Sequence, residues 1–512
     1  MQKYFRILVL IILTLAVIAS ASCGSSSNDG NGNGSGDSAE GGGNANNNPG
    51  EPGGESHEEN SKPDVREILA SLPDEDYGGY VFTIWTSNNY NSTLEGRQAP
   101  ELNAAGEAEE IGEPVNDALY MRDRLIEEKY NITIQYNMFA EGGPLYSAAR
   151  REITAGSNTF DFAMDMMMEV TKNLAQNGMA YDFNQIPNVD LDKEWWSKFA
   201  KRDLTIDGRF FFPTGDITAR YPGSQYLMIF NKQIFMDEGL AYPYQDVIDG
   251  NWTLDAFFDL IKDSSKDLNG DGILNSRDDF FGLVVESMAP FCFLRAAGEG
   301  LTKIVDGNPV LNARNEKLIA ITEKLASAWG NENYMYAPRN YTVYEEVPMF
   351  KEDRVMFLPM TGTNLSLFRD MESDFGIVPL PKYDSNQDEY YSHCQPWGSA
   401  AVTVPHNIEN AERTGMIVEA LAAAGKALVT PAAYDVTLKT KYARDEFSEI
   451  MFDIIIEGSS YDFMHLYNWG GVFDEYITSM VRGESFITKF DAREDRAQSQ
   501  MEVTIEAFQN VE

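Results

Sequence analysis

Strand-like and helix-like stretches alternate along the first part of the chain, between residues 78 and 165. Residues 80–85 (YVFTIW), 132–136 and 160–164 have the β-branched and aromatic composition of strands, and residues 115–130 and 145–155 between them have helical periodicity. Strands that alternate with helices form sheets covered by helices on both faces. The pattern therefore predicts an α/β fold, in which ligands bind beyond the carboxyl ends of the strands.

The N-terminus predicts where the protein works. Lys3 and Arg6 precede an apolar run over residues 7–19, which is typical of a secretory signal and too short to span a bilayer. The run ends in residues 20–24 (SASCG), which resemble the lipobox of bacterial lipoproteins. We therefore expect residues 1–22 to be a signal peptide and Cys23 to carry a lipid. Ordinary cleavage that leaves a free Cys23 is the alternative.

A low-complexity segment follows Cys23. Residues 24–65 are almost entirely Gly, Ser, Asn, Asp and Glu, so they cannot bury enough apolar surface to fold. We assign residues 23–77 to a flexible, lipid-anchored stalk.

The balance of charge restricts the partners. The chain has 80 acidic and 40 basic residues, a formal net charge of −40. This charge argues against nucleic acid or anionic lipid as a partner and favours a neutral or cationic ligand. Beyond Cys23 the chain has Cys292 and Cys394, and the sequence leaves open whether they pair.

Residues 267–278 (DLNGDGILNSRD) have the spacing of a calcium-binding loop. Gly272 permits the sharp turn at the sixth position, and the oxygen ligands would come from Asp267, Asn269, Asp271, the carbonyl of Ile273, Asn275 and Asp278. The alternative is a solvated turn rich in Asp and Asn. A cellulosomal dockerin would need two such loops, and we find only one in the sequence.

Four motifs resemble a known family. Residues 226–240 (YLMIFNKQIFMDEGL), followed by Pro243 and residues 252–257 (WTLDAF), resemble a signature of the extracellular solute-binding proteins of ABC importers, in the sugar-binding family that includes maltose-binding protein. Residues 281–283 (FGL), 350–357 (FKEDRVMF) and 375–383 (FGIVPLPKY) resemble three later motifs of the same family, in the same order. The resemblance covers about residues 78–510. Phe230 and Val355 depart from the usual Tyr and small residue, which leaves the subfamily and ligand open.

The resemblance implies a two-lobe, periplasmic-binding-protein-like α/β fold of type II, with hinge strands between the lobes. Lobe one would comprise residues 78–217 and 374–430, and lobe two would comprise residues 218–373 and 431–512. The hinges would lie near residues 216–225 and 371–376.

The same resemblance implies a carbohydrate site between the lobes, built from aromatic faces and planar polar side chains. The expected ligand-binding residues are Trp85, Ser87, Asn88, Asp165, Asp216, Arg220, Trp397 and Trp469. For each Trp, core packing is the alternative, whereas Trp195 and Trp196 have the pattern of a helix packing face.

The expected function is that of an extracytoplasmic lipoprotein, anchored to the cell membrane, that captures an oligosaccharide and delivers it as a monomer to an ABC transporter permease. The four histidines form no zinc motif, and no Gly-x-Ser-x-Gly elbow or phosphate loop occurs, so we expect no catalytic activity. A secreted glycoside hydrolase or lyase remains the rival, because paired carboxylates are recognised by distance and not by sequence. A peptide or another organic solute is the alternative ligand.

Overall fold

The computed structural model describes residues 64–87, 112–140, 142–329, 331, 333, 335–337, 345–368, 370–438 and 446–511. The predicted signal peptide, Cys23, most of the stalk and Asn88 lie outside these residues.

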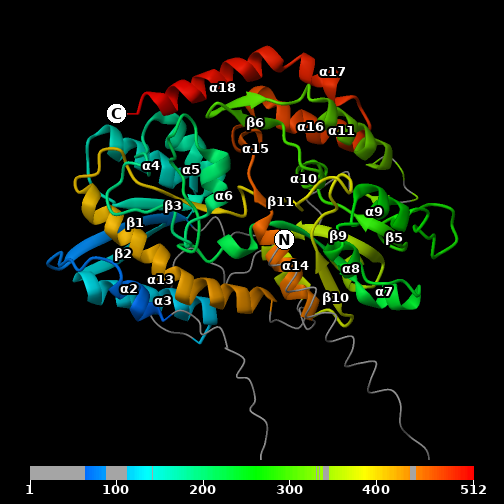
Figure 1. The fold of residues 1–512 in the computed structure, drawn as a ribbon, viewed down its shortest axis with the longest axis horizontal. Helices are drawn as coiled ribbons and strands as arrows, with labels where there is room; N and C mark the ends of the chain where they lie inside the picture. Colours follow the sequence, from blue (N-terminus) through cyan, green and yellow to red (C-terminus); the bar gives the residue numbers. More distant parts are fainter. Residues whose placement is uncertain are drawn as a thin grey trace, which may run out of the picture. The chain divides into compact units, whose positions relative to one another are not determined.

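The first sheet has the strand order β12-β3-β1-β2. Figure 1 shows β1, β2 and β3 of this sheet. Strands β1 (Tyr80–Ser87), β2 (Ile132–Phe139) and β3 (Phe162–Met166) are parallel, and β12 (Ala400–Thr403) runs antiparallel to β3. Helices α3 (Pro114–Tyr130) and α4 (Gly142–Thr154) connect β1 to β2 and β2 to β3. All five elements predicted from periodicity are confirmed, with ends that differ by up to three residues.

Helix α3 shows how local sequence sets these boundaries. The Glu113 carboxylate accepts hydrogen bonds from the backbone N–H groups of Val115 (3.3 Å) and Asn116 (2.7 Å), and Pro114 occupies the first helical position. The helix ends at Asn131, whose left-handed φ of 48° turns the chain directly into β2.

The second sheet has the order β10-β4-β9-β5-β8. Its strands are β4 (Tyr226–Asn231), β5 (Phe281–Val284), β8 (Met335–Tyr336), β9 (Val355–Thr361) and β10 (Phe375–Val378). Strands β5, β8 and β9 are parallel, and β4 is antiparallel to both β9 and β10. The helices of this region are α7 (Lys232–Asp237), α8 (Tyr244–Ile248), α9 (Leu254–Ile261), α10 (Ala289–Ala296), α11 (Glu316–Trp329), α12 (Glu346–Lys351) and η5 (Gly362–Phe368).

Both faces of this sheet are covered, as β4 shows. Leu227 and Ile229 belong to one buried apolar cluster, whereas Met228 and Phe230 belong to another. Because successive side chains of a strand point to opposite faces, the two clusters lie on opposite sides of the sheet. A strand buried on both faces explains the continuous apolar run YLMIF.

The strand β10 corrects the predicted lobe boundary. Residues 374–430 were expected in lobe one, yet Phe375 pairs with Asn231 and Val378 with Met228, so β10 belongs to the second sheet. The chain therefore leaves that sheet after Val378, later than the hinge expected at residues 371–376. Between the sheets, β11 (Ser392–His393) pairs in parallel with β13 (Ser459–Ser460). The backbone of Cys394 forms an isolated antiparallel β-bridge with that of Gln225.

The C-terminal helices correct the second boundary. Helix α13 (Ala411–Leu438) contacts α2 (Val65–Ala70) and α3, whereas α14 (Glu446–Glu457) contacts β10. Further on, α15 (Phe463–Tyr467) contacts α5 (Met167–Asn173), and α18 (Glu494–Gln509) contacts η3 (Ala175–Asn177). Both α5 and η3 follow β3 of the first sheet. Residues 431–512 thus pack on both halves and do not belong to lobe two alone.

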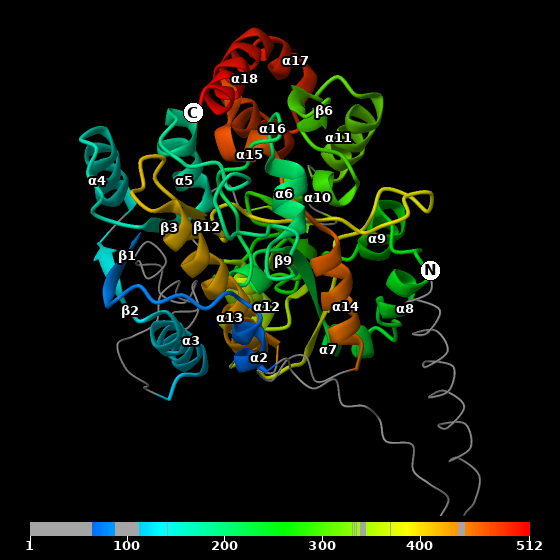
Figure 2. The same ribbon diagram turned by 60° about the vertical axis from the view of Figure 1, so that its left-hand side comes forward.

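The remaining elements form a third group (Figure 2). In this group α16 (Val472–Arg482) contacts α17 (Phe486–Asp491), α10 and α11, and α18 contacts η6 (Trp469–Gly471) and β7. The hairpin of β6 (Thr302–Val305) and β7 (Asn308–Leu311) and the helices α6 (Lys198–Leu204) and η4 (Tyr221–Gly223) complete the fold.

Helix α13 is long and apolar enough to cross a membrane by length and composition, but 67% of its apolar window is buried inside the protein. Its Glu419 carboxylate accepts hydrogen bonds from Trp195 Nε1 (3.0 Å) and Trp196 Nε1 (2.8 Å). Both indoles are buried, as expected of a packing face. Burial raises the pKa of Glu419 to about 7. We therefore describe α13 as a core helix.

Candidate ligand-binding site

Two predicted site residues meet where strands of the first sheet end. Ser87 is the last residue of β1, and its Oγ donates a 2.8 Å hydrogen bond to Oδ2 of Asp165 on β3. Asp165 Oδ1 accepts from the backbone N–H of Met166 (2.8 Å), at the start of α5. Asp165 is fully buried, and burial raises its pKa. Asp165 therefore fixes Ser87 and the strand end, and it has no surface to offer a ligand.

The third predicted residue that lies at this edge is Trp397. It belongs to a loop, residues 395–399, that leads into β12, and its side chain is 46% exposed. The loop backbone is held on two sides. The Met167 N–H donates to the Ser399 carbonyl (3.0 Å), and the Gln395 N–H donates to the Ser224 carbonyl (3.1 Å). A large indole presented from a fixed backbone is suited to stack on the apolar face of a ligand.

Glu286 joins this loop to the second sheet. It follows β5 at the carboxyl end of that strand, and its Oε1 accepts hydrogen bonds from Tyr226 Oη (2.8 Å) and Gln395 Nε2 (3.4 Å). The carboxyl ends of parallel strands in both sheets therefore converge on residues 395–399. Sequence reasoning missed Glu286, although the carboxyl-end rule applied to the motif at residues 281–283 would have found it.

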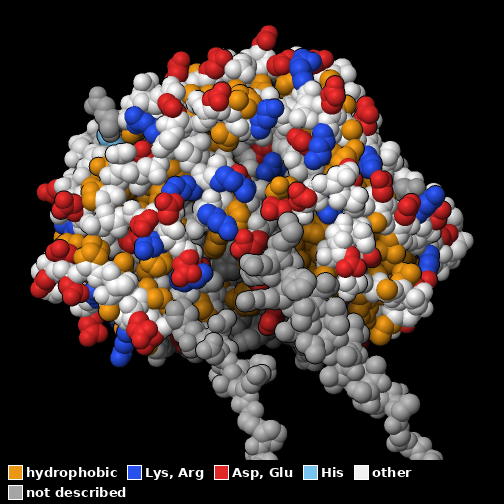
Figure 3. All heavy atoms as spheres, viewed as in Figure 1, with side chains coloured by type: hydrophobic (Ala, Val, Ile, Leu, Met, Phe, Trp, Pro, Cys, Tyr) orange, Lys and Arg blue, Asp and Glu red, His pale blue; other side chains and the backbone are white. Residues whose placement is uncertain are grey.

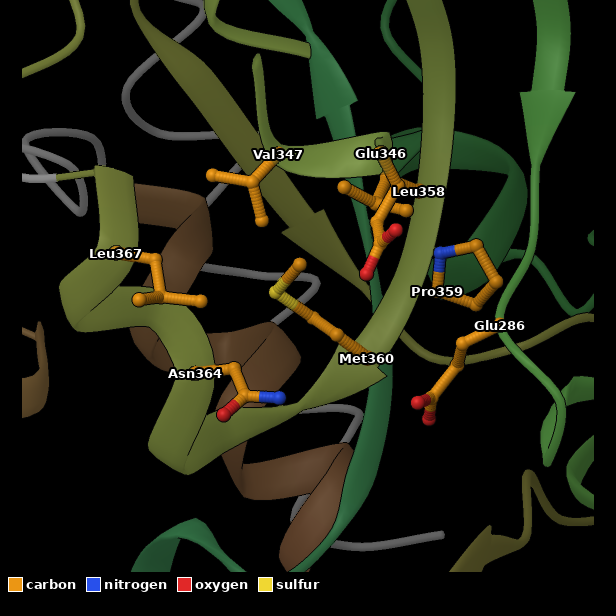
Figure 4. Close-up of a pocket in the computed structure, with 8 residues that line it drawn as sticks. All are labelled: Glu286, Glu346, Val347, Leu358, Pro359, Met360, Asn364 and Leu367. Carbon is orange, nitrogen blue, oxygen red and sulfur yellow. The ribbon is translucent and has the colours of Figure 1, made fainter. Parts of the chain in front are cut away.

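A small pocket lies beside Glu286, at the carboxyl end of β9 (Figure 4). Its lining residues are Glu286, Glu346, Val347, Leu358, Pro359, Met360, Asn364 and Leu367. Figure 4 shows Val347, Met360, Leu367 and Asn364 on one side of β9, and Pro359 with Glu286 on the other. Its cavity volume of about 10 Å³ has room for one water molecule and not for a sugar. The pocket therefore forms part of a wall at the strand ends and is not a complete site.

Trp85 does not lie at the site. It is 6% exposed, and its ring stacks on Phe160 with centroids 4.3 Å apart. A second ring, Phe139, lies 5.1 Å away. A ligand cannot stack on a ring whose faces are already covered, so the prediction that Trp85 contacts ligand is wrong.

Trp469 is also a core residue. It is 1% exposed, stacks on Tyr467 at 5.3 Å and donates from Nε1 to Thr504 Oγ1 (2.9 Å) of α18. The neighbouring Gly470 adopts φ of 63° and lies against Ala497 of the same helix. The glycine thus allows a helix to approach, and not a ligand.

Asp216 and Arg220 lie in the crossing between the sheets, as expected, but both are buried. Asp216 accepts a 2.5 Å hydrogen bond from Thr430 Oγ1 and forms an ion pair with Lys426 (3.7 Å), both on α13. Burial raises the pKa of Asp216 to about 6. The structure assigns Asp216 to the attachment of the core helix to the crossing. Asn88, the remaining predicted ligand-binding residue, lies outside the described residues.

The calcium-type loop at residues 267–278 is held by its own backbone. Asp267 accepts from the N–H groups of Gly270 and Gly272 (both 2.7 Å), Asn269 from Asp271 (2.9 Å), and Asp271 from Ile273 (2.8 Å). The bond from Gly272 lowers the pKa of Asp267, which keeps the carboxylate charged.

The residue that closes this loop is the buried Asp279, which accepts from Leu268 (2.9 Å) and Asn275 (2.8 Å), and not the predicted Asp278. Oxygen-rich side chains fit a hard cation such as Ca²⁺. Within the described residues, however, no group of three His, Cys, Asp or Glu side chains is placed to hold a metal ion. The calcium assignment stays a prediction.

The two remaining cysteines, Cys292 and Cys394, are both buried and free. Burial raises the pKa of the Cys394 thiol to about 11, which keeps it protonated at neutral pH.

No protein-family model and no curated protein matches the sequence. Solved structures do match the fold. Mycobacterium tuberculosis UspC has 13% identity and a TM-score of 0.54, over 82% of this chain and 99% of that one. A cyclo/maltodextrin-binding protein in complex with maltotetraose has 12% identity and a TM-score of 0.52, over 84% and 96% of the two chains.

A third match is the ABC substrate-binding protein Lmo0181 of Listeria monocytogenes, in complex with cycloalternan. It has 12% identity and a TM-score of 0.50, over 83% of this chain and 99% of that one. At such low identity the likeness concerns the fold. The chain has the two-lobe fold of ABC substrate-binding proteins.

Proposed function

We propose that this protein is an extracytoplasmic solute-binding protein that captures a carbohydrate, most simply an oligosaccharide, and delivers it to an ABC transporter. The observation that carries the proposal is the convergence of both sheets' strand ends on the loop at residues 395–399, where Trp397 is exposed. Two of the similar structures are described in complex with maltotetraose and with cycloalternan, which supports a carbohydrate ligand.

The mechanism follows from the two-lobe architecture. A ligand that touches both strand edges binds the closed arrangement better than the open one, and this extra affinity shifts the equilibrium towards closure. The transporter permease would then recognise the closed form. The proteins of similar fold are binding proteins, so we propose binding without catalysis.

Calorimetric titration of the purified chain tests this function. Maltotetraose, cycloalternan and a panel of other oligosaccharides would be titrated, with tri- and tetrapeptides as the control class. We expect one saturable carbohydrate site per chain and no hydrolysis of the bound sugar. Turnover of an oligosaccharide at catalytic protein concentrations would replace the proposal with a glycoside hydrolase, and binding of peptides alone would replace the ligand class.

The membrane anchor is a separate proposal that rests on Cys23 and the apolar run before it. Acyl chains on Cys23 would hold the protein on the membrane, with the low-complexity stalk as tether. Cys23→Ala should move the protein from the membrane fraction to the soluble fraction or leave it unprocessed, while Cys292→Ala should change neither. An unaltered membrane fraction after Cys23→Ala contradicts the anchor.

Calcium at residues 267–278 is likewise proposed. A cation that binds only the folded chain stabilises it by roughly 2.7 kcal/mol at a hundredfold excess over Kd. A chelator should therefore lower Tm, and Asp271→Ala should abolish that response, whereas Asp263→Ala, just before the loop, should preserve it. Equal Tm values with calcium and with chelator would leave a metal-free turn held by the hydrogen bonds above.

A further inference from the structure

A second cavity lies apart from the site described above and shares no lining residue with it. Its volume is about 270 Å³, close to the lower limit for small-molecule sites. Three segments build it. These are α6, the stretch from the end of α10 to β7, and the junction of β13 with α15. The lining residues are Arg202, Asp203, Arg295, Gly298, Glu299, Gly300, Thr302, Lys303, Ile304, Asn312, Tyr461, Asp462 and Phe463.

The carboxylates of this cavity are already engaged by the protein. Asp462 accepts from Thr302 Oγ1 (2.6 Å) and from the Met464 N–H (2.8 Å). Asp203 forms an ion pair with Arg202 (2.6 Å) and accepts from the Tyr461 N–H (2.9 Å). These acidic groups serve to hold the walls, so they do not leave a site for a cation.

Glu299 is engaged in the same way. It accepts from Asn312 Nδ2 (3.0 Å) and lies 3.9 Å from Lys317. Each lining carboxylate therefore has a basic partner, and the ion pairs together leave no excess negative charge.

The cations of the cavity are less well satisfied. Arg295 lies 3.8 Å from Asp462, donates from Nη1 to the Glu299 carbonyl at 3.3 Å and from Nη2 to the Tyr461 carbonyl at 3.2 Å, and its buried Nε has no hydrogen-bond partner. Lys303 is exposed and forms no ion pair with any described residue. Arg295 and Lys303 both line the cavity, so their N–H groups are the donors that a ligand there would meet.

Gly300 leaves room for this arrangement. A Cβ at that position would collide with Arg295 Nη1 and Asp462 Oδ2. The chain therefore has a glycine where Arg295 must approach Asp462 and line the cavity.

The cavity lining is balanced in charge, with three basic and three acidic side chains, although the chain as a whole is strongly acidic. Figure 3 shows Lys and Arg side chains near the middle of the visible face, with Asp and Glu side chains among them, in the region that Figure 1 labels α6 and α10. Because the net charge of −40 repels anions at long range, an anion would be held here only by close contacts.

We propose that this cavity binds a small molecule that carries a compact oxyanion, a carboxylate or a phosphate, with Lys303 and Arg295 as its partners. Charge-assisted hydrogen bonds from a guanidinium and an ammonium suit both anions. The inference concerns a site other than the strand-end site and does not depend on the carbohydrate.

Calorimetry and thermal unfolding of the purified full chain test the proposal, with inorganic phosphate and succinate as the anionic probes and glucose as the neutral one. We expect saturable binding and a raised Tm with at least one anion, and neither effect with glucose. Lys303→Gln should weaken anion binding at least tenfold, roughly the worth of a hydrogen bond to a charged group. Because Lys303 is exposed, this variant should fold.

Lys262→Gln is the matched control, since Lys262 is also exposed and forms no ion pair with a described residue. It should bind the anion like the wild type. Arg295→Lys keeps the charge and removes the fork of donors. It should weaken anion binding less than the double variant, in which Lys303→Gln is added to Arg295→Lys. Absence of saturable binding for both anions, stronger binding of glucose, or equal affinity in wild type and Lys303→Gln overturns the proposal.

Discussion

The loop at residues 395–399 and the segment at residues 463–471 both present a tryptophan beside glycine, but in opposite environments. Trp469 lies against Tyr467 and donates its Nε1–H to Thr504 of α18, so it is enclosed. Trp397 lies on a backbone that is also held by hydrogen bonds, but its side chain is 46% exposed. The comparison teaches that a nearby glycine does not distinguish a ligand platform from a packing contact. What distinguishes them is whether a later helix packs over the ring.

The largest expected effect is the loss of stability in Trp469→Ala. Removal of this enclosed side chain leaves a cavity and takes away one hydrogen bond to the Thr504 hydroxyl, and should lower the free energy of unfolding by roughly 3–5 kcal/mol. Urea unfolding followed by circular dichroism measures it. Trp397→Ala is the control and should change the same quantity by less than about 1 kcal/mol. Equal losses in the two variants would break the comparison.

A pH effect is the second in size, and it sharpens the contrast between the same two segments. His465 of α15 and His393, which precedes the loop at residues 395–399, form a buried pair. His465 Nδ1 lies 2.7 Å from His393 Nε2. Their rings contact Phe291, and His465 stacks on Phe473 at 4.4 Å. Burial lowers the pKa of His465 to about 3, and burial together with its partner lowers that of His393.

The sign follows from proton linkage. The unfolded histidines titrate near pH 6.5, above their folded pKa values, so their contribution to stability is complete above pH 6.5 and is lost as the pH falls towards 3. The loss is at most about 1.4 kcal/mol per pH unit for each histidine. Asp216 acts in the opposite direction, since its folded pKa of about 6 exceeds the unfolded value.

Urea unfolding between pH 7 and pH 4 isolates the histidines when wild type is compared with His465→Gln. The wild type should lose stability relative to the variant as the pH falls. His406→Gln, which removes an exposed histidine, should follow the wild type. Parallel pH curves for wild type and His465→Gln would contradict the account.

The smallest effect concerns ligand affinity and depends on the proposed function. Trp397→Ala should weaken oligosaccharide binding by about 1–3 kcal/mol, because the stacking face is lost, while Trp397→Phe should retain most of the affinity. Calorimetry with the oligosaccharide that binds the wild type measures both. Unaltered affinity in Trp397→Ala would remove the loop from the site and leave the fold unaffected.

Local patterns predicted the first sheet well because β1, α3, β2, α4 and β3 follow one another in sequence and in space. The placement of β10 was not predictable in this way, since a strand's own residues do not name its partner. Phe375 pairs with Asn231, which lies 144 positions earlier in the chain. The assignment of the C-terminal helices to lobe two was wrong for the same reason.

The geometry at the strand ends was predicted in part, and its role in ligand binding stays a prediction. Ser87 and Asp165 were brought together because both end parallel strands, and Trp397 lies where the returning chain enters β12. The prediction for Trp85 was wrong because a parallel strand is covered on both faces. A side chain two residues before the end of such a strand is still in the core. Glu286 was missed because the rule that found Ser87 was applied to one sheet and not to the other.

The contact of α18 with the first half of the chain has a consequence for biosynthesis. Phe508 packs edge-on against Phe211, with ring centroids 4.7 Å apart, and against Phe212. A ribosome must therefore add 297 further residues, 508 − 211, after Phe211 before that aromatic side chain finds its final neighbour. Such a chain completes its native core late, which keeps apolar surface open during synthesis. The core around Phe211 and Phe212 therefore depends on residues that are synthesised much later than the strands and helices beside it.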